Sequence, residues 1–482
     1  MKRVIVVGNG MVGYKFCEKL RNRCDDAEII VYGEEPRPAY DRVHLSRFFS
    51  GSAAEDLLMA PLSWYSDNRI QLHLGELVTE IDATNQKIKT HKGCVDHYDY
   101  LVLATGSSAF VPQVEGVERS GVFVYRTIED LNQIAAYARK MKSGGVMGGG
   151  LLGLEAAKAL LDLGLQTHII EFASRLMPRQ IDDAGSQVLV QQLSQLGITI
   201  HTGKNTSKIE GNGKLEGLAF SDGSQLPIDM LVISAGIRPR DELAKTSGLA
   251  VHPRGGIQVD NYLRTSGKNI FAIGEAVCHN NMVYGLVAPG YEMADIVAAQ
   301  ISEESPKEFN GFDMSTKLKM LGVDVGSFGD AFGETPGSVP IVFQSRRNGI
   351  YKRINISEDG TMLLGGILIG DASQYNLFHQ MAINKLKLPA EPEMLILGAK
   401  GAPEGNGIKD LPETAQICSC ENVSKGDIVS QITENGAKTV EDLKKNTKAC
   451  TGCGGCSPMV TDILKATLEG LGLNVKKSLC EH

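Results

Sequence analysis

The feature that most constrains this chain of 482 residues is a glycine-rich turn that occurs twice, 140 residues apart. The first copy, in KRVIVVGNGMVGYKFCEKL, places Gly8, Gly10 and Gly13 between a continuous apolar run and an amphipathic segment. A strand, a G-x-G-x-x-G turn and a helix form a dinucleotide-binding unit, because glycines let a pyrophosphate approach the backbone and let helix pack on strand. Free amide groups at the helix N-terminus then face the phosphates.

The second copy, GGVMGGGLLGLEAAKALLDLGLQTHIIE, contains Gly148, Gly150 and Gly153, then a helical segment, a strand and Glu171. A carboxylate at the end of that strand accepts hydrogen bonds from ribose hydroxyls and repels a 2′-phosphate. No Arg or Lys stands directly beside Glu171, and Arg175 follows four residues later. We therefore expect NADH, and not NADPH, at this turn.

An acidic pair follows the strand that comes after the first turn. In EIIVYGEE, Glu34, or else Glu35, is placed to accept a hydrogen bond from a ribose 2′-hydroxyl, and the alternative is a surface acidic turn. Two dinucleotide turns imply two dinucleotides. A flavin and a nicotinamide are the usual pair, because a bound flavin must receive hydride from a donor.

Three further apolar segments, YDYLVLATGSS, DMLVISAGIRP and NIFAIGEAV, end in small residues. Such strand ends let the chain cross close to a cofactor. Each alone is also compatible with an ordinary packed strand end, but the three together favour cofactor contacts. The residues concerned are Ala104, Thr105, Gly106, Gly236, Gly274 and Glu275.

With these segments the chain resembles the pyridine-nucleotide–disulfide oxidoreductase family in its broad sense. The resemblance implies an α/β fold with two Rossmann-like, glutathione-reductase-like domains, FAD in the first and NAD(P)H in the second. It implies an FAD domain of residues 1–111 and 239–302, an NAD domain of 112–238, and an α+β interface domain of 303–387 that is often a dimer contact. A Pro/Gly-rich stretch, 388–415, predicts a linker.

Within this family, YDRVHLSR resembles the PYxRPxLSK segment of ferredoxin- and rubredoxin-reductase-like flavoproteins. That resemblance implies that Arg42 and Arg47 lie near the flavin, with Arg47 keeping the charge where Lys is common. It also implies that Glu275 holds the ribityl chain where most members have Asp, and that Glu155 lies beside the nicotinamide. Arg47 and Glu155 are the catalytic residues that it implies, and Val78 is assigned to the FAD site.

Cysteine placement and charge argue against several classes of protein. The redox C-x-x-x-x-C motif that disulfide reductases carry early in the FAD domain is absent. Cys17 and Cys24 flank the first helical segment instead, so we do not expect this chain to reduce a disulfide substrate. The net charge of −8 disfavours nucleic acid and anionic membranes as partners. No apolar run reaches the roughly 18 residues of a membrane helix, and the N-terminal apolar run continues into a glycine turn and not into a cleavage site. We therefore expect a cytoplasmic protein.

The C-terminal segment, 416–472, predicts a small domain of three short helices, the last of which begins near Pro458 and has one apolar face. Ser424 with Asp427 and Thr439 with Asp442 each have the spacing of a helix N-cap and its third residue. The apolar residues of this segment are too few to form a hydrophobic core that stabilises it alone. Domains of this size need a metal site or a disulfide.

Five cysteines of this segment are candidates for that role. Cys418 and Cys420 form a C-x-C pair, whereas Cys450, Cys453 and Cys456 form two overlapping C-x-x-C pairs. Four thiolates suit a [2Fe–2S] cluster or zinc, although zinc sites favour C-x₂₋₄-C in both halves. The arrangement resembles bacterioferritin-associated ferredoxin domains, which have C-x-C and then C-G-x-C. That resemblance implies a [2Fe–2S] cluster on Cys418, Cys420, Cys453 and Cys456, with Cys450 a spare thiol or a replacement ligand.

The segments MSTKLKMLGVDVGSFGD and YGLVAPGYEMA resemble the flavoprotein part of assimilatory nitrite reductase large subunits and, equally, the electron-transfer subunit of assimilatory nitrate reductases. After Cys456 only Cys480 remains, too few for a [4Fe–4S]–sirohaem centre. We therefore expect electrons to pass from NADH through FAD and the cluster to a separate catalytic protein, first of all nitrate reductase, or to a small electron carrier. The alternatives are the flavoprotein portion of a nitrite reductase large subunit, a rubredoxin or ferredoxin reductase with a fused cluster, and a redox- or iron-sensing regulator.

Overall fold

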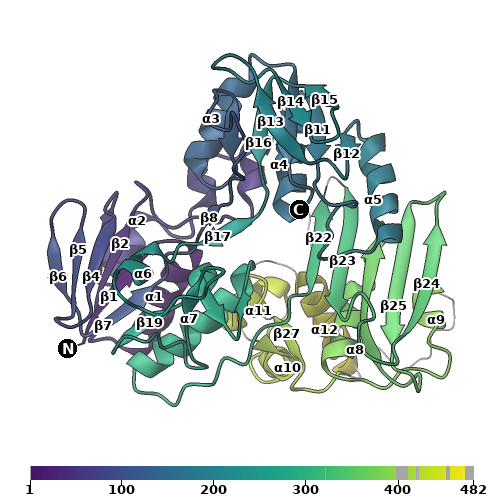
Figure 1. Ribbon diagram of the computed structural model, residues 1–482. Helices are drawn as coiled ribbons and strands as arrows, with labels where there is room; N and C mark the ends of the chain where they lie inside the picture. The colour runs from purple at the N-terminus through teal and green to yellow at the C-terminus, as the bar shows by residue number, and fades with distance from the viewer. Residues whose placement is uncertain are drawn as a thin grey trace. The chain divides into compact units, whose positions relative to one another are not determined.

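The computed structural model describes residues 2–320, 322–397, 411–418, 421, 423–451 and 456–472. The chain divides into two compact units, whose elements are labelled in Figure 1. Unit 1 contains Met1–Gly148, Glu155–Thr167 and Thr206–Phe312, and unit 2 contains Gly149–Leu154, His168–Asn205 and Asp313–His482.

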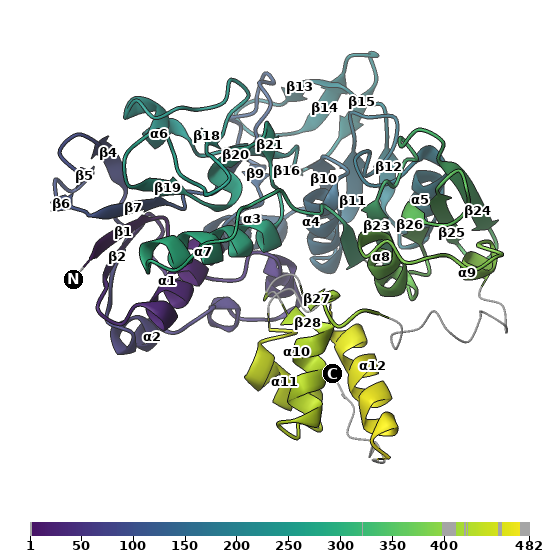
Figure 2. The same ribbon diagram turned by 90° about the horizontal axis from the view of Figure 1, so that it is seen from below.

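A five-stranded parallel sheet of order β19-β7-β1-β2-β3 forms the centre of unit 1. Its strands are β1 (Arg3–Val7), β2 (Glu28–Gly33), β3 (Ile70–Leu74), β7 (Tyr100–Leu103) and β19 (Ile270–Ala272). The apolar runs of β1, β2 and β7 are almost fully buried, as expected for parallel strands covered on both faces. Helices α1 (Met11–Arg23) and α7 (Val287–Ile301) lie side by side in both views (Figures 1 and 2).

Unit 1 also carries three small sheets and a two-stranded ribbon. The sheets are β4 (Val78–Asp82), β5 (Lys87–Thr90) and β6 (Val95–His97); β13 (Thr206–Glu210), β14 (Gly217–Phe220) and β15 (Gln225–Pro227); and β18 (Ile257–Gln258), β20 (Val277–His279) and β21 (Met282–Val283). The ribbon pairs β8 (Ser107–Ala109) with β17 (Ile237–Pro239) in antiparallel register. Short helices are α2 (Leu62–Asp67), α3 (Ile128–Ala138), α6 (Glu242–Thr246) and the 3₁₀ turns η1 (Leu45–Ser50), η2 (Ala54–Leu57) and η3 (Gly274–Ala276).

The second glycine turn follows a second set of parallel strands. In unit 1, β10 (Ser143–Met147) and β9 (Val122–Val124) each pair in parallel with β16 (Met230–Ile233). Along the chain β10 leads through the turn into α4 (Leu151–Asp162) and then β11 (Gln166–Ile170), which pairs in parallel with β12 (Thr199–His201). Both glycine segments therefore join a strand to a helix, and the α/β fold expected from the sequence is confirmed.

In unit 2, a five-stranded antiparallel sheet has the order β22-β23-β26-β25-β24. Its strands are β22 (Thr316–Met320), β23 (Val323–Gly329), β24 (Val339–Ser345), β25 (Ile350–Ile356) and β26 (Leu363–Ile369). Three helices, α5 (Asp183–Gln195), α8 (Tyr375–Ile383) and α9 (Met394–Leu397), belong to the same unit. The Asp182 carboxylate at the N-cap of α5 accepts hydrogen bonds from Tyr351 (2.6 Å) and Arg353 (3.0 Å), which fixes this helix against β25.

The last part of unit 2 is a small helical bundle. Helices α10 (Lys425–Thr433), α11 (Val440–Thr447) and α12 (Ser457–Gly470) pack together (Figure 2) around Ile428, Leu443 and Ile463, all 0–1% exposed. The three helices expected from the sequence are confirmed. A short antiparallel pair, β27 (Gln416–Cys418) and β28 (Val423–Ser424), precedes them and was not foreseen. The domain boundaries stay predictions.

Candidate functional site

The first glycine turn is shaped by close backbone packing on one side and by open space on the other. Gly8 has a φ of +113°, and a Cβ there would overlap the carbonyl oxygen of Ala104. Likewise, a Cβ at Gly13 would overlap the carbonyl oxygen of Gly8. A Cβ at Gly10 would meet nothing within 4 Å. In the same turn, the buried Nδ2 of Asn9 has no hydrogen-bond partner. Open space lined by an unpaired donor fits a pyrophosphate.

The second turn repeats this geometry. Gly148 has a φ of +120°, and a Cβ there would overlap the carbonyl oxygen of Ser234, whereas a Cβ at Gly150 would meet nothing within 4 Å. Gly153 lies in the first turn of α4. The two segments thus share both the positive φ and the open side, which makes the second turn a fit for a second dinucleotide.

Glu171 follows β11 and is held beside the second turn. Its Oε2 accepts a hydrogen bond from the Gly149 N–H at 2.6 Å, and its Oε1 accepts one from the Ala173 N–H, also at 2.6 Å. The side chain is only 9% exposed. Two backbone donors therefore orient the carboxylate, and each oxygen keeps a second lone pair for a ribose hydroxyl.

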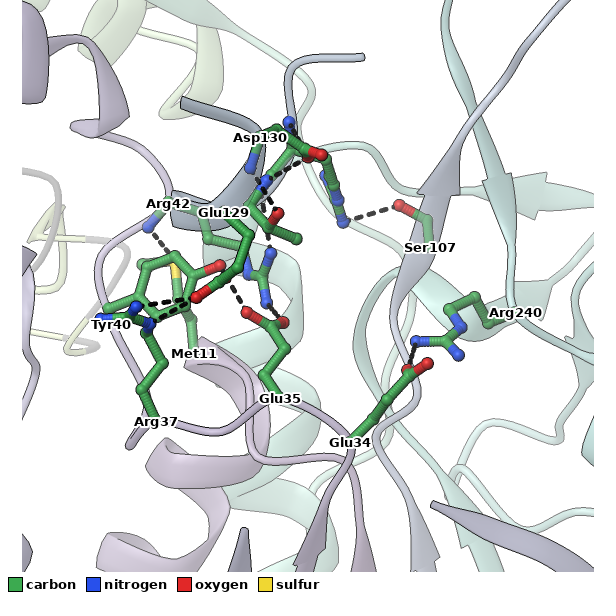
Figure 3. A network of polar contacts seen from close by, with 12 residues as sticks. Met11, Glu34, Glu35, Arg37, Tyr40, Arg42, Ser107, Glu129, Asp130 and Arg240 are labelled. Carbon is green, nitrogen blue, oxygen red and sulfur yellow. Dashed lines mark hydrogen bonds and ion pairs between the residues drawn. The ribbon is translucent and has the colours of Figure 1, made fainter. Parts of the chain in front are cut away.

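The acidic pair after β2 separates into two ion pairs, which Figure 3 shows. Glu34 pairs with Arg240 at 2.5 Å. Glu35 accepts a hydrogen bond from the Tyr40 hydroxyl at 2.7 Å and forms an ion pair with Arg42. Both candidates for the ribose contact are therefore engaged with side chains of unit 1.

Arg126 joins the predicted flavin residues into one charged network and was missed by the sequence analysis. Its guanidinium donates to Glu275 Oε2 at 2.7 Å and to the Ser107 hydroxyl at 2.8 Å, and its carbonyl oxygen accepts from Arg42 at 3.0 Å. Ser107 also donates to Glu275 Oε2, at 2.7 Å. No motif marks Arg126, since it is a single cation before the capped helix α3; only the fold brings it to Glu275.

The small-residue strand ends come together through the β8–β17 ribbon. Gly106 and Gly236, both with positive φ, precede these two strands, and the Gly236 carbonyl oxygen accepts from the Phe110 N–H at 2.9 Å. Thr105, which follows Ala104, donates to the Arg240 carbonyl oxygen at 2.7 Å. Of the remaining strand-end residues, Glu275 accepts a hydrogen bond from Ser107 of β8, and Gly274 packs against Val12 of α1. Val78, which was assigned separately to the FAD site, is buried at the start of β4.

Glu155 on α4 is a buried acid with an unsatisfied oxygen. Its Oε2 has no hydrogen-bond partner, and neither has the buried Tyr125 hydroxyl. Burial raises the pKa of Glu155 to about 7; His44 opposes the rise and Asp41 adds to it. His44 and Asp41 are themselves paired, Nδ1 to Oδ2, at 2.6 Å. Arg47 is exposed on η1, and among the described residues no carboxylate forms an ion pair with it.

In the C-terminal bundle the described cysteines gather at the N-terminus of α12. Cys456 is the residue before α12, and its thiol lies 3.5 Å from the Cys450 thiol. Hydrogen bonds with Cys418 and then Cys450 raise the pKa of the Cys456 thiol, so all three sulfurs are neighbours. Thiols converging on a helix N-terminus suit a cluster whose charge the free amides stabilise. The other two predicted ligands, Cys420 and Cys453, lie outside the described residues.

Comparison with protein families gives three matches along the chain. Residues 2–299 match the pyridine nucleotide-disulphide oxidoreductase family, residues 315–386 the rubredoxin NAD+ reductase C-terminal domain, and residues 416–466 the BFD-like [2Fe-2S] binding domain. The first match implies FAD and NAD(P)H, and the last implies a [2Fe–2S] cluster.

Among curated proteins, the chain is 47% identical to the nitrite reductase (NADH) large subunit of Escherichia coli, matching 100% of this chain and 57% of that protein. It is 35% identical to the assimilatory nitrate reductase electron transfer subunit of Bacillus subtilis, over 96% of this chain and 59% of that protein. It is 30% identical to the rubredoxin-NAD(+) reductase of Alcanivorax borkumensis, over 81% of this chain and 99% of that protein. The chain therefore spans 57% and 59% of the length of these nitrite and nitrate reductase relatives.

Two solved structures show the same fold. The putidaredoxin reductase–putidaredoxin complex has a TM-score of 0.74 at 24% identity, covering 83% of this chain and 97% of that one. The ferredoxin reductase of Rhodopseudomonas palustris has a TM-score of 0.74 at 24% identity, covering 83% and 100%. No helix among the described residues has the length and apolar character needed to cross a membrane.

Proposed function

Because this chain belongs to the pyridine nucleotide-disulphide oxidoreductases, we propose that it takes hydride from NADH and delivers the electrons singly to an acceptor centre. One observation carries the proposal: two glycine turns of the same backbone geometry and a BFD-like [2Fe-2S] domain occur in one chain. Nicotinamide gives electrons in pairs, whereas an iron–sulfur cluster takes one at a time. A flavin connects the two, because it exchanges electrons in either way.

In this proposal the first turn holds FAD. Support comes from the open space at Gly10, the unpaired Asn9 Nδ2 and the Arg42–Arg126–Glu275 network. The network brings two arginines together, and guanidinium groups suit the binding of a diphosphate. The proposed FAD residues are Gly8, Gly10, Gly13, Glu34 or Glu35, Arg42, Arg47, Val78, Ala104, Thr105, Gly106, Gly274 and Glu275, to which the structure adds Arg126.

The second turn holds NADH in the same proposal. Glu171 supports NADH over NADPH, because a carboxylate fixed by two backbone N–H groups repels a 2′-phosphate. The proposed residues are Gly148, Gly150, Gly153, Glu155, Glu171 and Gly236. Glu155 is proposed to face the reacting ring, where its buried carboxyl excludes water and can hold a proton.

Cys418, Cys420, Cys453 and Cys456 are the proposed ligands of the [2Fe–2S] cluster. The gathering of Cys418 and Cys456 at the α12 N-terminus supports this assignment. The cluster supplies a one-electron carrier, and the chain supplies four thiolates together with backbone N–H groups that stabilise their charge.

The proposed acceptor is a nitrogen-oxide reductase. A separate nitrate reductase is the first candidate. A nitrite-reducing centre is the second candidate, supported by the 47% identity to a nitrite reductase large subunit against 35% to the nitrate reductase subunit. The proposal also includes self-association through residues 303–387 and action in the cytoplasm.

An acceptor assay tests this choice. The protein, reconstituted with FAD and cluster, is mixed with NADH and either an assimilatory nitrate reductase catalytic subunit or a sirohaem nitrite reductase. We expect NADH consumption to depend on nitrate with the first or on nitrite with the second. Oxidation of NADH by ferricyanide with no transfer to either enzyme would rule out both acceptors.

A further inference from the structure

Phe172 is an aromatic side chain that the fold leaves in solvent. It is 74% exposed, the highest fraction among the large apolar side chains of the described residues. Burial of a Phe ring against another flat apolar group is favourable, so an exposed ring can serve as a contact for a flat apolar ligand.

The position of Phe172 is fixed by its two neighbours. Glu171 accepts from the Gly149 N–H through one oxygen and from the Ala173 N–H through the other, both at 2.6 Å. The bond from Ala173 closes a small turn with Phe172 at its middle. Phe172 therefore stands one residue away from the carboxylate that is proposed to bind the ribose.

We propose that the Phe172 ring stacks on the adenine of NADH and so positions the adenosine half of the cofactor. Adenine is bonded to C1′ of the ribose whose hydroxyl groups are proposed to donate hydrogen bonds to Glu171. A ligand anchored at that ribose consequently presents its base to the surface next to Glu171, where Phe172 is exposed. The inference rests on the proposed oxidation of NADH and assigns Phe172 a role in binding and none in hydride transfer.

The test compares Phe172→Ala with wild-type holoprotein, using ferricyanide as the acceptor. Base–aromatic stacking contributes about 1–3 kcal/mol, so we expect KM for NADH to rise about 5- to 150-fold while kcat is unchanged. Phe172→Trp should keep the wild-type KM. Leu62→Ala, which removes another exposed apolar side chain (58% exposed) remote in sequence from both turns, is the matched control.

Reduced nicotinamide mononucleotide separates stacking from general damage, since it lacks the adenosine half. We expect wild type and Phe172→Ala to have the same kcat/KM for this donor. An unchanged KM for NADH in Phe172→Ala, or an equal loss with both donors, would overturn the inference. If wild type does not oxidise NADH at all, the proposed function fails instead, so the two failures are distinguishable.

A second observation, independent of the first, concerns the thiol that the cluster assignment leaves over. The Cys450 and Cys456 sulfurs lie 3.5 Å apart, and the Cys450 N–H donates to the Cys456 sulfur at 3.2 Å. A disulfide has a sulfur–sulfur distance of about 2.0 Å, so the two sulfurs would have to move about 1.5 Å closer to form one.

We infer that Cys450 and Cys456 form an intramolecular disulfide when hydrogen peroxide destroys the cluster. Two thiols lose two electrons and two protons to form the sulfur–sulfur bond, and the peroxide is reduced to two molecules of water. The disulfide protects Cys456 from irreversible oxidation until a thiol reductant restores it.

Peptide mass mapping after peroxide treatment of the 482-residue holoprotein in the presence of a chelator tests this inference. We expect a Cys450–Cys456 disulfide that dithiothreitol removes. Cys450→Ser should lack it and should accumulate sulfinic or sulfonic acid at Cys456, while Cys94→Ser, which lacks an exposed thiol elsewhere, should behave as wild type. Pairing of Cys456 with any other cysteine in wild type would contradict the inference.

Discussion

Glu155 is a buried carboxyl group on α4 whose surroundings disfavour its charged form. Its Oε2 is buried without a partner, and desolvation raises its pKa to about 7 from an ordinary value of 4.5. The charged groups that act on it are His44 and Asp41, which are paired with each other, and not Arg47. A buried acid that titrates near neutrality is suited to hold or release a proton at a reacting centre.

This pKa predicts how stability depends on pH. Below about pH 4.5 Glu155 is neutral in both the folded and unfolded chain; between 4.5 and 7 the unfolded chain ionises first, so folding loses stability as pH rises. The loss is at most about 3 kcal/mol and is complete above pH 7. Glu155→Gln should abolish it, so unfolding midpoints of wild type and variant should diverge between pH 5 and 8. Parallel curves would contradict the assignment, and Glu80→Gln, an exposed carboxylate, should follow wild type.

Sequence reasoning at this scale found residues that belong to motifs and missed those that depend on folding. Glu171 could be placed beside the second turn because strand, turn and carboxylate are consecutive in the chain. Arg126 could not be found, because its contacts with Glu275 and Arg42 span 149 and 84 residues. Such long-range pairs leave no local pattern.

At the scale of single elements, two glycines of the first turn have different roles: Gly8 is needed for folding, and Gly10 is proposed to leave room for FAD. Gly8 combines a positive φ with a Cβ position that overlaps backbone, so Gly8→Ala should destabilise the fold by several kcal/mol. Gly10 has a φ of −89° and open space, so Gly10→Ala should fold normally yet bind FAD weakly. Thermal unfolding of the flavin-free proteins, with FAD binding by fluorescence, measures both effects. Full FAD binding by Gly10→Ala would exclude the open side as the pyrophosphate site.

The C-terminal bundle allows a matched test of its cysteines. Cys450→Ala should keep the cluster, because Cys450 is not a predicted ligand, whereas Cys453→Ala should lose or damage it. Iron and acid-labile sulfide analysis with the visible spectrum measures the cluster directly. Loss of the cluster in Cys450→Ala with retention in Cys453→Ala would reverse the ligand assignment.

Local signals predicted these helices well. Ser424 with Asp427 and Thr439 with Asp442 form the two capping boxes expected from their spacing, and α12 buries the expected stripe of apolar residues. The β27–β28 pair was missed, because two or three residues are too few for a periodic pattern.

At the scale of the whole molecule, the chain combines two dinucleotide turns, an antiparallel domain and a thiol-rich bundle. In the proposed route, hydride passes from NADH at the second turn to FAD at the first turn, and electrons then pass singly to the bundle. This route requires that the bundle accepts electrons from the flavin.

Anaerobic rapid mixing of the holoprotein with NADH tests this claim most directly. We expect flavin absorbance to bleach first and cluster absorbance to fall in a second phase, which Cys453→Ala eliminates without slowing the first. Flavin reduction with no later cluster reduction, or a bundle that contains zinc and no acid-labile sulfide, would contradict it.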